Sequence, residues 1–190
     1  MRRPTSAEIV GLLEQPVEDR RPIVHRIEQQ ARIRDLIAAL RIATIPLTRE
    51  ILINILGNRH SKTAVPVLLD ALVDPCRRVR VAAATALRNI PSPAVGSALL
   101  ARFENEEDLG VKAWIASALG GVGYDPAIPH LIPALASNHR GLRYLAAWSL
   151  GALRAAEAEG AIEQALTRES DAEVQKRMRE ALGFIREGQD

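Results

Sequence analysis

The feature that most constrains the fold is a stretch that recurs along the chain at a nearly constant interval. Its first full copy spans residues 79–90, VRVAAATALRNI, and later copies begin at Val111, Leu142 and Val174. A weaker copy spans residues 48–57. The leucine near the end of each copy falls at position 56, 87, 119, 150 or 182, so the intervals are 31 or 32 residues. A period in this range predicts a stacked array of helical hairpins.

Apolar residues within each copy recur at the spacing of one helix face. In the first full copy this stripe consists of Val79, Ala83, Ala86, Leu87 and Ile90. Such a stripe predicts a helix with one buried side. Ala84, Ala116 and Ala147 share one repeat position, and we expect these small residues to lie where neighbouring helices approach. A single hairpin cannot bury its apolar face alone, so the repeats are expected to stack into one continuous core.

The predicted fold is all-α, a right-handed α-α superhelix of about five to six hairpins. No linker divides the chain, so we expect one solenoid domain over residues 1–190, with clear repeats at 64–183 and divergent helices at 5–60. Within it, Gly57 is placed as a helix C-cap, and Pro133 is expected to bend a helix. Ser137 and Asn138 are expected to cap the helix that follows them.

Composition excludes several classes of protein. Cys76 is the one cysteine, so neither an intramolecular disulfide nor a cysteine metal cluster is expected. No apolar run follows the N-terminal arginines, and no stretch approaches the roughly 20 apolar residues of a membrane span. These features predict a cytoplasmic protein with no membrane partner. The formal net charge is only +2, although 22 of the 25 basic residues are arginine.

The repeat motifs resemble those of HEAT repeats, in particular the short HEAT-like class named after phycobilisome lyase subunits. Residues 64–87, AVPVLLDALVDPCRRVRVAAATAL, show the pattern of an AxPxLxxAL helix, a DP turn and a second helix with VR and AL. Residues 127–135 and 142–151 match nearly as well. The resemblance implies a curved solenoid whose second helices line a concave groove. It also implies a choice among scaffolds, assembly factors, bilin lyase subunits and a few nucleic-acid enzymes, so it constrains shape more than function.

A basic residue follows the first core residue of several second helices. Arg80, Lys112 and Arg143 occupy this position, and Gln175 replaces them in the last copy. One interpretation is a basic ladder that binds phosphates or an acidic chain. The alternative, which we favour, is an internal ladder in which each base bonds the Asp or Asn of the preceding turn. The expected turn residues are Asp74, Asn105 and Asn138.

The candidate partner-binding residues are centred on an aromatic pair in the 142–153 copy. Tyr144 and Trp148 stand four residues apart at positions that tolerate polar residues in other copies, and Arg140 precedes Tyr144 by four residues. Exposed aromatics with an arginine are typical of a binding hot spot. Alternatively, the two rings pack on the neighbouring hairpin. Arg77 and Arg88 complete the candidate set if they converge with this pair, and belong to a solvated face otherwise.

Other residues with chemical potential have simpler structural interpretations. Trp114 aligns with Ala82 beside the core stripe and is expected to pack. The four histidines show no i, i+3 or i, i+4 pair, so no metal site is predicted. The glycines of residues 120–123 are expected to end a helix. The acidic residues of 104–108 are expected to be solvated in an exposed turn. We therefore predict no catalytic residue and no cofactor.

Three functions fit these patterns. The favoured one is a non-catalytic scaffold or adaptor that holds a partner protein or peptide in its groove. Nucleic-acid binding is the alternative suggested by the arginines, although the net charge is small for it. The third is a subunit of a bilin-lyase-like enzyme, which only the family resemblance suggests.

Overall fold

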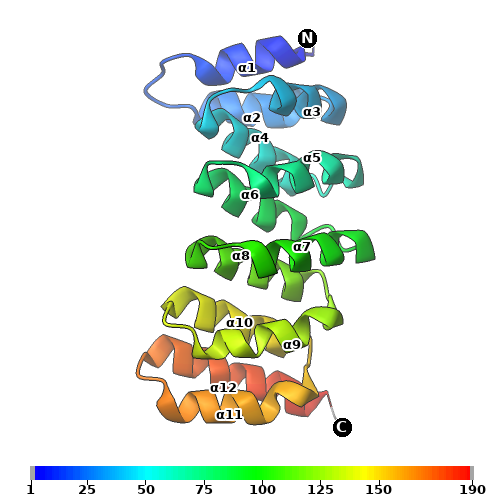
Figure 1. The fold of residues 1–190 in the computed structure, drawn as a ribbon. Helices are drawn as coiled ribbons and strands as arrows, with labels where there is room; N and C mark the ends of the chain where they lie inside the picture. The colour runs from blue at the N-terminus through cyan, green and yellow to red at the C-terminus, as the bar shows by residue number, and fades with distance from the viewer. Residues whose placement is uncertain (1–2, 189–190) are drawn as a thin grey trace. The chain divides into compact units, whose positions relative to one another are not determined.

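The computed structural model describes residues 3–188, and the terminal residues 1–2 and 189–190 of the predicted span lie outside it. The described residues form twelve α-helices and no strand, which confirms the all-α prediction. Consecutive helices pair as six hairpins (Figure 1). These residues divide into two compact units, one ending at Ile90 and the other beginning at Pro91. The single-domain organisation stays a prediction.

The first unit holds three hairpins. Their helices are α1 (Ser6–Glu14), α2 (Arg21–Gln30), α3 (Ile33–Ile42), α4 (Pro46–Asn58), α5 (Val65–Asp70) and α6 (Arg77–Leu87), with 3-10 turns η1 (Lys62–Ala64) and η2 (Ala71–Val73) on either side of α5. Thr5 opens α1 with a capping box, because its side chain accepts from the Glu8 N–H while Glu8 accepts from the Thr5 N–H. The second helices α4 and α6 pack on each other and bury Leu56 and Leu87.

The second unit repeats the same plan. It contains α7 (Pro93–Asn105), α8 (Leu109–Gly121), η3 (Asp125–Ala127), α9 (Ile128–Leu131), η4 (Pro133–Ala136), α10 (Arg140–Ala152), η5 (Ala156–Ala158), α11 (Glu159–Arg168) and α12 (Ala172–Glu187). The second helices α8, α10 and α12 pack successively against one another. The repeated leucine of each of these helices is buried: Leu119, Leu150 and Leu182.

Small residues allow the second helices to approach closely, as the repeat pattern predicts. Ala84, Ala116 and Ala147 are fully buried. In the second unit the hydroxyl of Ser149 on α10 donates to the Ala116 carbonyl on α8 over 2.8 Å. A Cβ atom at Gly151 would lie 2.8 Å from the Cα atom of Ala181 on α12, so this position requires glycine.

Three local predictions are wrong in detail. Gly57 is not a C-cap: it lies inside α4, where a Cβ atom would come within 2.7 Å of Ala86, so its role is close packing. Pro133 does more than bend a helix, because α9 ends at Leu131 and the chain continues as the 3-10 turn η4. The cap of α10 is His139, whose Nδ1 atom accepts from the Leu142 N–H.

Candidate binding surface on the second helices

The basic ladder is internal, in the way that the structural interpretation predicts, but its partners are backbone carbonyls. Arg80 donates to the Asp74 carbonyl over 3.0 Å, and Arg143 donates to the Ser137 carbonyl over 3.0 Å. Gln175 donates to the Glu169 carbonyl over 2.7 Å. Arg80, Arg143 and Gln175 thus each bond the residue six positions earlier. Lys112 differs, because its ammonium group lies 5.0 Å from the centre of the Phe103 ring.

The turn residues of this ladder are Asp74, Glu106, Ser137 and Glu169, so Asn105 and Asn138 were the wrong residues. All four side chains accept a hydrogen bond from the backbone N–H two residues later, which fixes the turn. Glu106 is also buried and pairs with Arg102 over 2.5 Å, so the prediction of a solvated acidic turn is wrong for this residue.

Glu169 joins two hairpins of the second unit. Its carboxylate accepts from Nε and Nη2 of Arg143 at 2.6 and 3.0 Å, and the Glu169 side chain is 3% exposed. The hydrogen bond from Arg143, supported by backbone N–H groups of Ser170 and Asp171, lowers the pKa of Glu169 although burial opposes the shift. Glu169 therefore stays ionised and its oxygens are occupied, which leaves it poorly suited to act as a general base.

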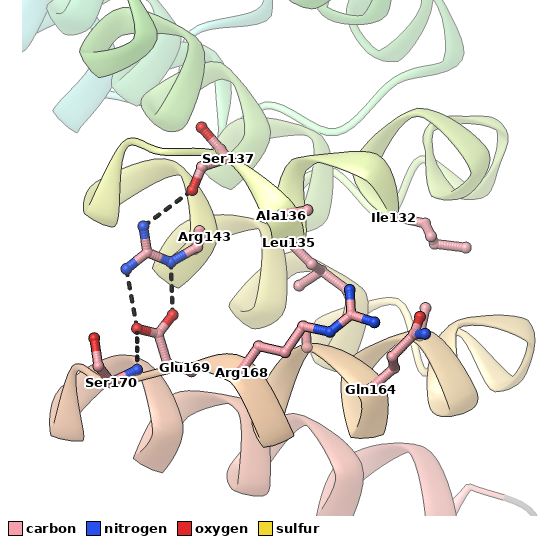
Figure 2. A pocket seen from close by; sticks show the side chains of 11 residues that line it. Ile132, Leu135, Ala136, Ser137, Arg143, Gln164, Arg168, Glu169 and Ser170 are labelled. Atoms are coloured by element: carbon pink, nitrogen blue, oxygen red, sulfur yellow. Dashed lines mark hydrogen bonds and ion pairs between the residues drawn. The ribbon is translucent and has the colours of Figure 1, made fainter.

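A pocket of about 480 Å³ opens beside this ion pair, between η4 and α11 (Figure 2). Arg143, Ser137 and Glu169 close one end of it, and Leu135, with other apolar side chains, lines its wall. Arg168 and Gln164 extend from α11 along the other side. No cluster of three or more metal-ligating His, Cys, Asp or Glu side chains occurs within residues 3–188.

The predicted binding residues Arg140, Tyr144 and Trp148 share one face of α10, and two of them bond to α12 or its N-cap. Nε of Arg140 lies 2.6 Å from Oδ2 of Asp171, and this hydrogen bond raises the pKa of Arg140 and lowers that of Asp171. The Tyr144 hydroxyl accepts from Nη2 of Arg177 over 2.6 Å, and this guanidinium lies 4.8 Å from the centre of the Tyr144 ring. Tyr144 and Trp148 are both half-buried.

Arg77 and Arg88 belong to α6 and its C-cap in the first unit, apart from the α10 residues in sequence. Arg77 is exposed at the start of α6, and Arg88 is half-buried. The structure therefore brings together three of the five predicted residues on one helix of one unit. A binding role for any of the five stays a prediction.

Two further aromatic residues extend the α10 pair, and sequence reasoning missed both. Trp114 on α8 is 40% exposed, so the prediction that it packs is wrong, and Phe184 on α12 is 49% exposed. Counted from the first core residue of each second helix, Trp114, Trp148 and Phe184 stand three, six and ten residues on, and Tyr144 stands two residues on. At 100° per residue these positions fall within a sector of about 100° on the helix surface.

Because α8, α10 and α12 pack side by side, these four residues form one face, here named the aromatic surface: Trp114, Tyr144, Trp148 and Phe184. The chain has six aromatic residues and all of them lie after residue 90, so the four represent a strong concentration. Aromatic side chains supply large contact areas at low entropic cost and are enriched at protein interfaces. The repeat register could have revealed this face, had all three helices been aligned on it.

Paired helices in a single register define an α-helical repeat protein. Residues 33–120 match the family model of HEAT repeats, and residues 111–137 match that of the PBS lyase HEAT-like repeat. The chain is a HEAT-repeat protein, as its motifs indicate, and the match begins at residue 33, within the stretch that departs from the sequence pattern. No curated protein matches the sequence significantly.

Two solved structures, an engineered protein and a lyase complex, align over most of the chain. The engineered protein is 18% identical, the alignment covers 96% of this chain and 89% of that chain, and the TM-score is 0.62. The complex of CpcE and CpcF of phycocyanin lyase from Nostoc sp. PCC7120 is 20% identical over 97% of this chain and 96% of that chain, with a TM-score of 0.43. The first likeness supports the fold alone. Within residues 3–188, no helix is both long and apolar enough to cross a bilayer.

Proposed function

We propose that the chain is a non-catalytic cytoplasmic scaffold that binds a partner protein or peptide on the aromatic surface. The observation that carries this proposal is the exposure of Trp114 and Phe184 on either side of the α10 aromatic pair. Three packed helices present these rings on a rigid support, which lowers the entropic cost of binding. Arg140 and Arg177, already held by ion pairs, add a polar rim.

The charge of the second unit favours a protein over a nucleic acid at this surface. Residues 91–190 contain ten basic and 14 acidic residues, a formal charge of −4. A phosphate backbone would be repelled by such a unit, whereas aromatic rings suit apolar side chains of a protein partner. We therefore expect this surface to bind a protein in preference to a nucleic acid, and the binding assay below includes DNA to check this.

A phage-displayed library of random peptides, selected on the full chain, tests the proposal. Peptides recovered on the wild type should lose binding to Trp114→Ser and Phe184→Ser, because both side chains are exposed and their removal leaves the core intact. Thr167→Ser, on the exposed face of α11, is the matched control and should bind like the wild type. Selected peptides that bind all four proteins equally would place the site elsewhere.

A labelled DNA duplex in the same assay addresses the alternative function. Binding whose logarithm falls steeply with the logarithm of salt concentration would indicate phosphate contacts and would contradict the protein-binding proposal if peptides failed to bind. We expect no such binding by the second unit.

A further inference from the structure

One edge of the first unit is unusually apolar. Four large apolar side chains are exposed there: Ile42 (53%), Ile45 (42%), Leu47 (37%) and Val73 (66%). Ile42 ends α3, Ile45 and Leu47 flank the start of α4, and Val73 ends η2, so the four surround the turns from α3 to α4 and from η2 to α6. We name these four residues the apolar edge.

Two ion pairs hold the turns of the apolar edge together. Arg49 of α4 binds Asp74 in the following turn, with Nε 2.8 Å from Oδ2. Arg78 of α6 reaches back to Glu50 of α4, with Nε 3.0 Å from Oε2. The exposed side chains therefore belong to one fixed surface rather than to two independent loops.

The equivalent turns of the second unit carry no large exposed apolar side chain among the described residues. Asn105, Ala136 and Arg168 occupy the position of Ile42 and Val73 in the repeat. The helix N-caps there are Asp108, His139 and Asp171, and each side chain accepts from a first-turn N–H group. An apolar turn is thus a property of the first unit and not of the repeat.

Helices α4 and α6 of the first unit begin at this edge without a side-chain N-cap. Their N-cap residues are Ile45 for α4 and Cys76 for α6, and neither side chain bonds the helix. The N-cap side chains therefore supply no acceptor to these two helix N-termini, each of which carries a partial positive charge beside exposed apolar groups.

Basic residues slightly outnumber acidic ones at this edge: Arg41, Arg49, Arg77 and Arg78 against Glu50, Asp70 and Asp74. Arg41 precedes Ile42 and is exposed, and Arg77 is exposed at the start of α6. Residues 1–90 carry 15 basic and nine acidic residues, a formal charge of +6, in contrast with the second unit. A groove of about 240 Å³ lies between α3 and the α5–η2 segment, with Leu40, Arg41 and Val67 among its lining residues.

We propose that the apolar edge binds an acidic amphipathic helix of a partner protein. The apolar side chains of this helix would pack on Ile42, Ile45, Leu47 and Val73. Its carboxylates would lie at the N-termini of α4 and α6 and face Arg41. An anionic bilayer is a less suitable partner, because Asp70 in the groove would repel its uniform charge, whereas a helix can place its carboxylates away from Asp70. Nucleic acid offers the apolar edge no apolar counterpart. This surface lies wholly in the first unit and does not depend on the aromatic surface.

A synthetic peptide provides the test. A fluorescein-labelled helical peptide of about 18 residues, with leucines on one face and glutamates on the other, is titrated with the full chain in an anisotropy assay. The control peptide replaces every glutamate with lysine. We expect the glutamate peptide to bind and the lysine peptide not to bind, with affinity falling as salt is added.

Three variants of the chain locate the binding. Val73→Asp should weaken the glutamate peptide about tenfold or more, because it places a charge in the exposed apolar contact without disturbing the core. Cys76→Asp should also weaken it, because the new side chain caps α6 in place of the peptide. Phe184→Ala, on the aromatic surface, should leave the affinity unchanged.

Several results would overturn the proposal. These are equal binding of both peptides, no binding of the glutamate peptide, and an affinity that Val73→Asp does not alter. A dimeric mass by light scattering that Val73→Asp reduces to a monomer would identify a second copy as the occupant. Tighter binding to phosphatidylglycerol vesicles than to the peptide would identify a lipid surface instead. Failure of the phage selection on the aromatic surface would leave this test unaffected.

Discussion

A Cβ atom built on Gly120 would lie 2.7 Å from the Cα atom of Ser149, so the backbones of α8 and α10 are as close as glycine permits. Gly120→Ala should therefore push the two helices apart and cost about 1–3 kcal/mol of stability, measured by chemical unfolding. Gly183 occupies the same repeat position on α12, where a Cβ atom meets nothing within 4 Å. Gly183→Ala should instead stabilise by about 1 kcal/mol through helix propensity. Equal effects of the two substitutions would contradict this packing.

The Arg143–Glu169 pair should make the second unit sensitive to acid. Hydrogen bonds in the folded chain stabilise the ionised form of Glu169. The contribution of this carboxylate to the free energy of unfolding is therefore complete above its ordinary pKa of 4.5, and it is lost as the pH falls through the lowered pKa. Glu169→Gln should cost about 3 kcal/mol at neutral pH, because it leaves Arg143 without its partner. The difference from the wild type should shrink in acid, as followed by urea unfolding at several pH values. Glu107→Gln, at an exposed position in the equivalent turn two repeats earlier, should have little effect at any pH.

Capping can be restored in the first unit. Cys76→Asp should stabilise by about 1 kcal/mol, since Asp108 and Asp171 cap the equivalent helices of the second unit. Thermal unfolding measures the gain, and Cys76→Ala separates capping from loss of the thiol. A stability of Cys76→Asp no greater than that of Cys76→Ala would show that the first turn of α6 is satisfied in another way.

Trp148 is expected to contribute to both binding and stability. Trp148 is half-buried and belongs to the aromatic surface, so Trp148→Ala should weaken the binding of a peptide selected on the wild type by about 2 kcal/mol. Calorimetric titration gives the affinity, and circular dichroism gives the folded fraction by which it is corrected. An unchanged affinity per folded molecule would make Trp148 a packing residue only.

The repeat register was readable from the sequence because burial selects it. Leu56, Leu87, Leu119 and Leu150 are fully buried, as their spacing predicts. The turns were harder to align, because the period alternates between 31 and 32 residues and the turn bonds involve backbone carbonyls that any residue supplies. A shift of one residue therefore separated the expected Asn105 and Asn138 from the residues that fix the turns.

Exposure on the second helices was also beyond the sequence pattern. Trp114 adjoins the core stripe, and only the way in which the neighbouring helices cover it decides whether it is buried. The same holds for the apolar edge: Ile42 and Val73 continue apolar helices in sequence, yet both side chains emerge at the end of a helix. Helical periodicity identifies the buried stripe, and the limits of that stripe depend on packing.

The confinement of every aromatic residue to positions after residue 90 makes the two units optically distinct. Intrinsic fluorescence and near-ultraviolet circular dichroism report on the second unit alone, whereas the far-ultraviolet signal counts helices from both. Overlaying the denaturation profiles recorded with these probes therefore asks whether the chain melts as a whole. Coincident profiles are expected of the single domain that the uninterrupted repeats predict, and separate profiles would reveal two cooperative blocks.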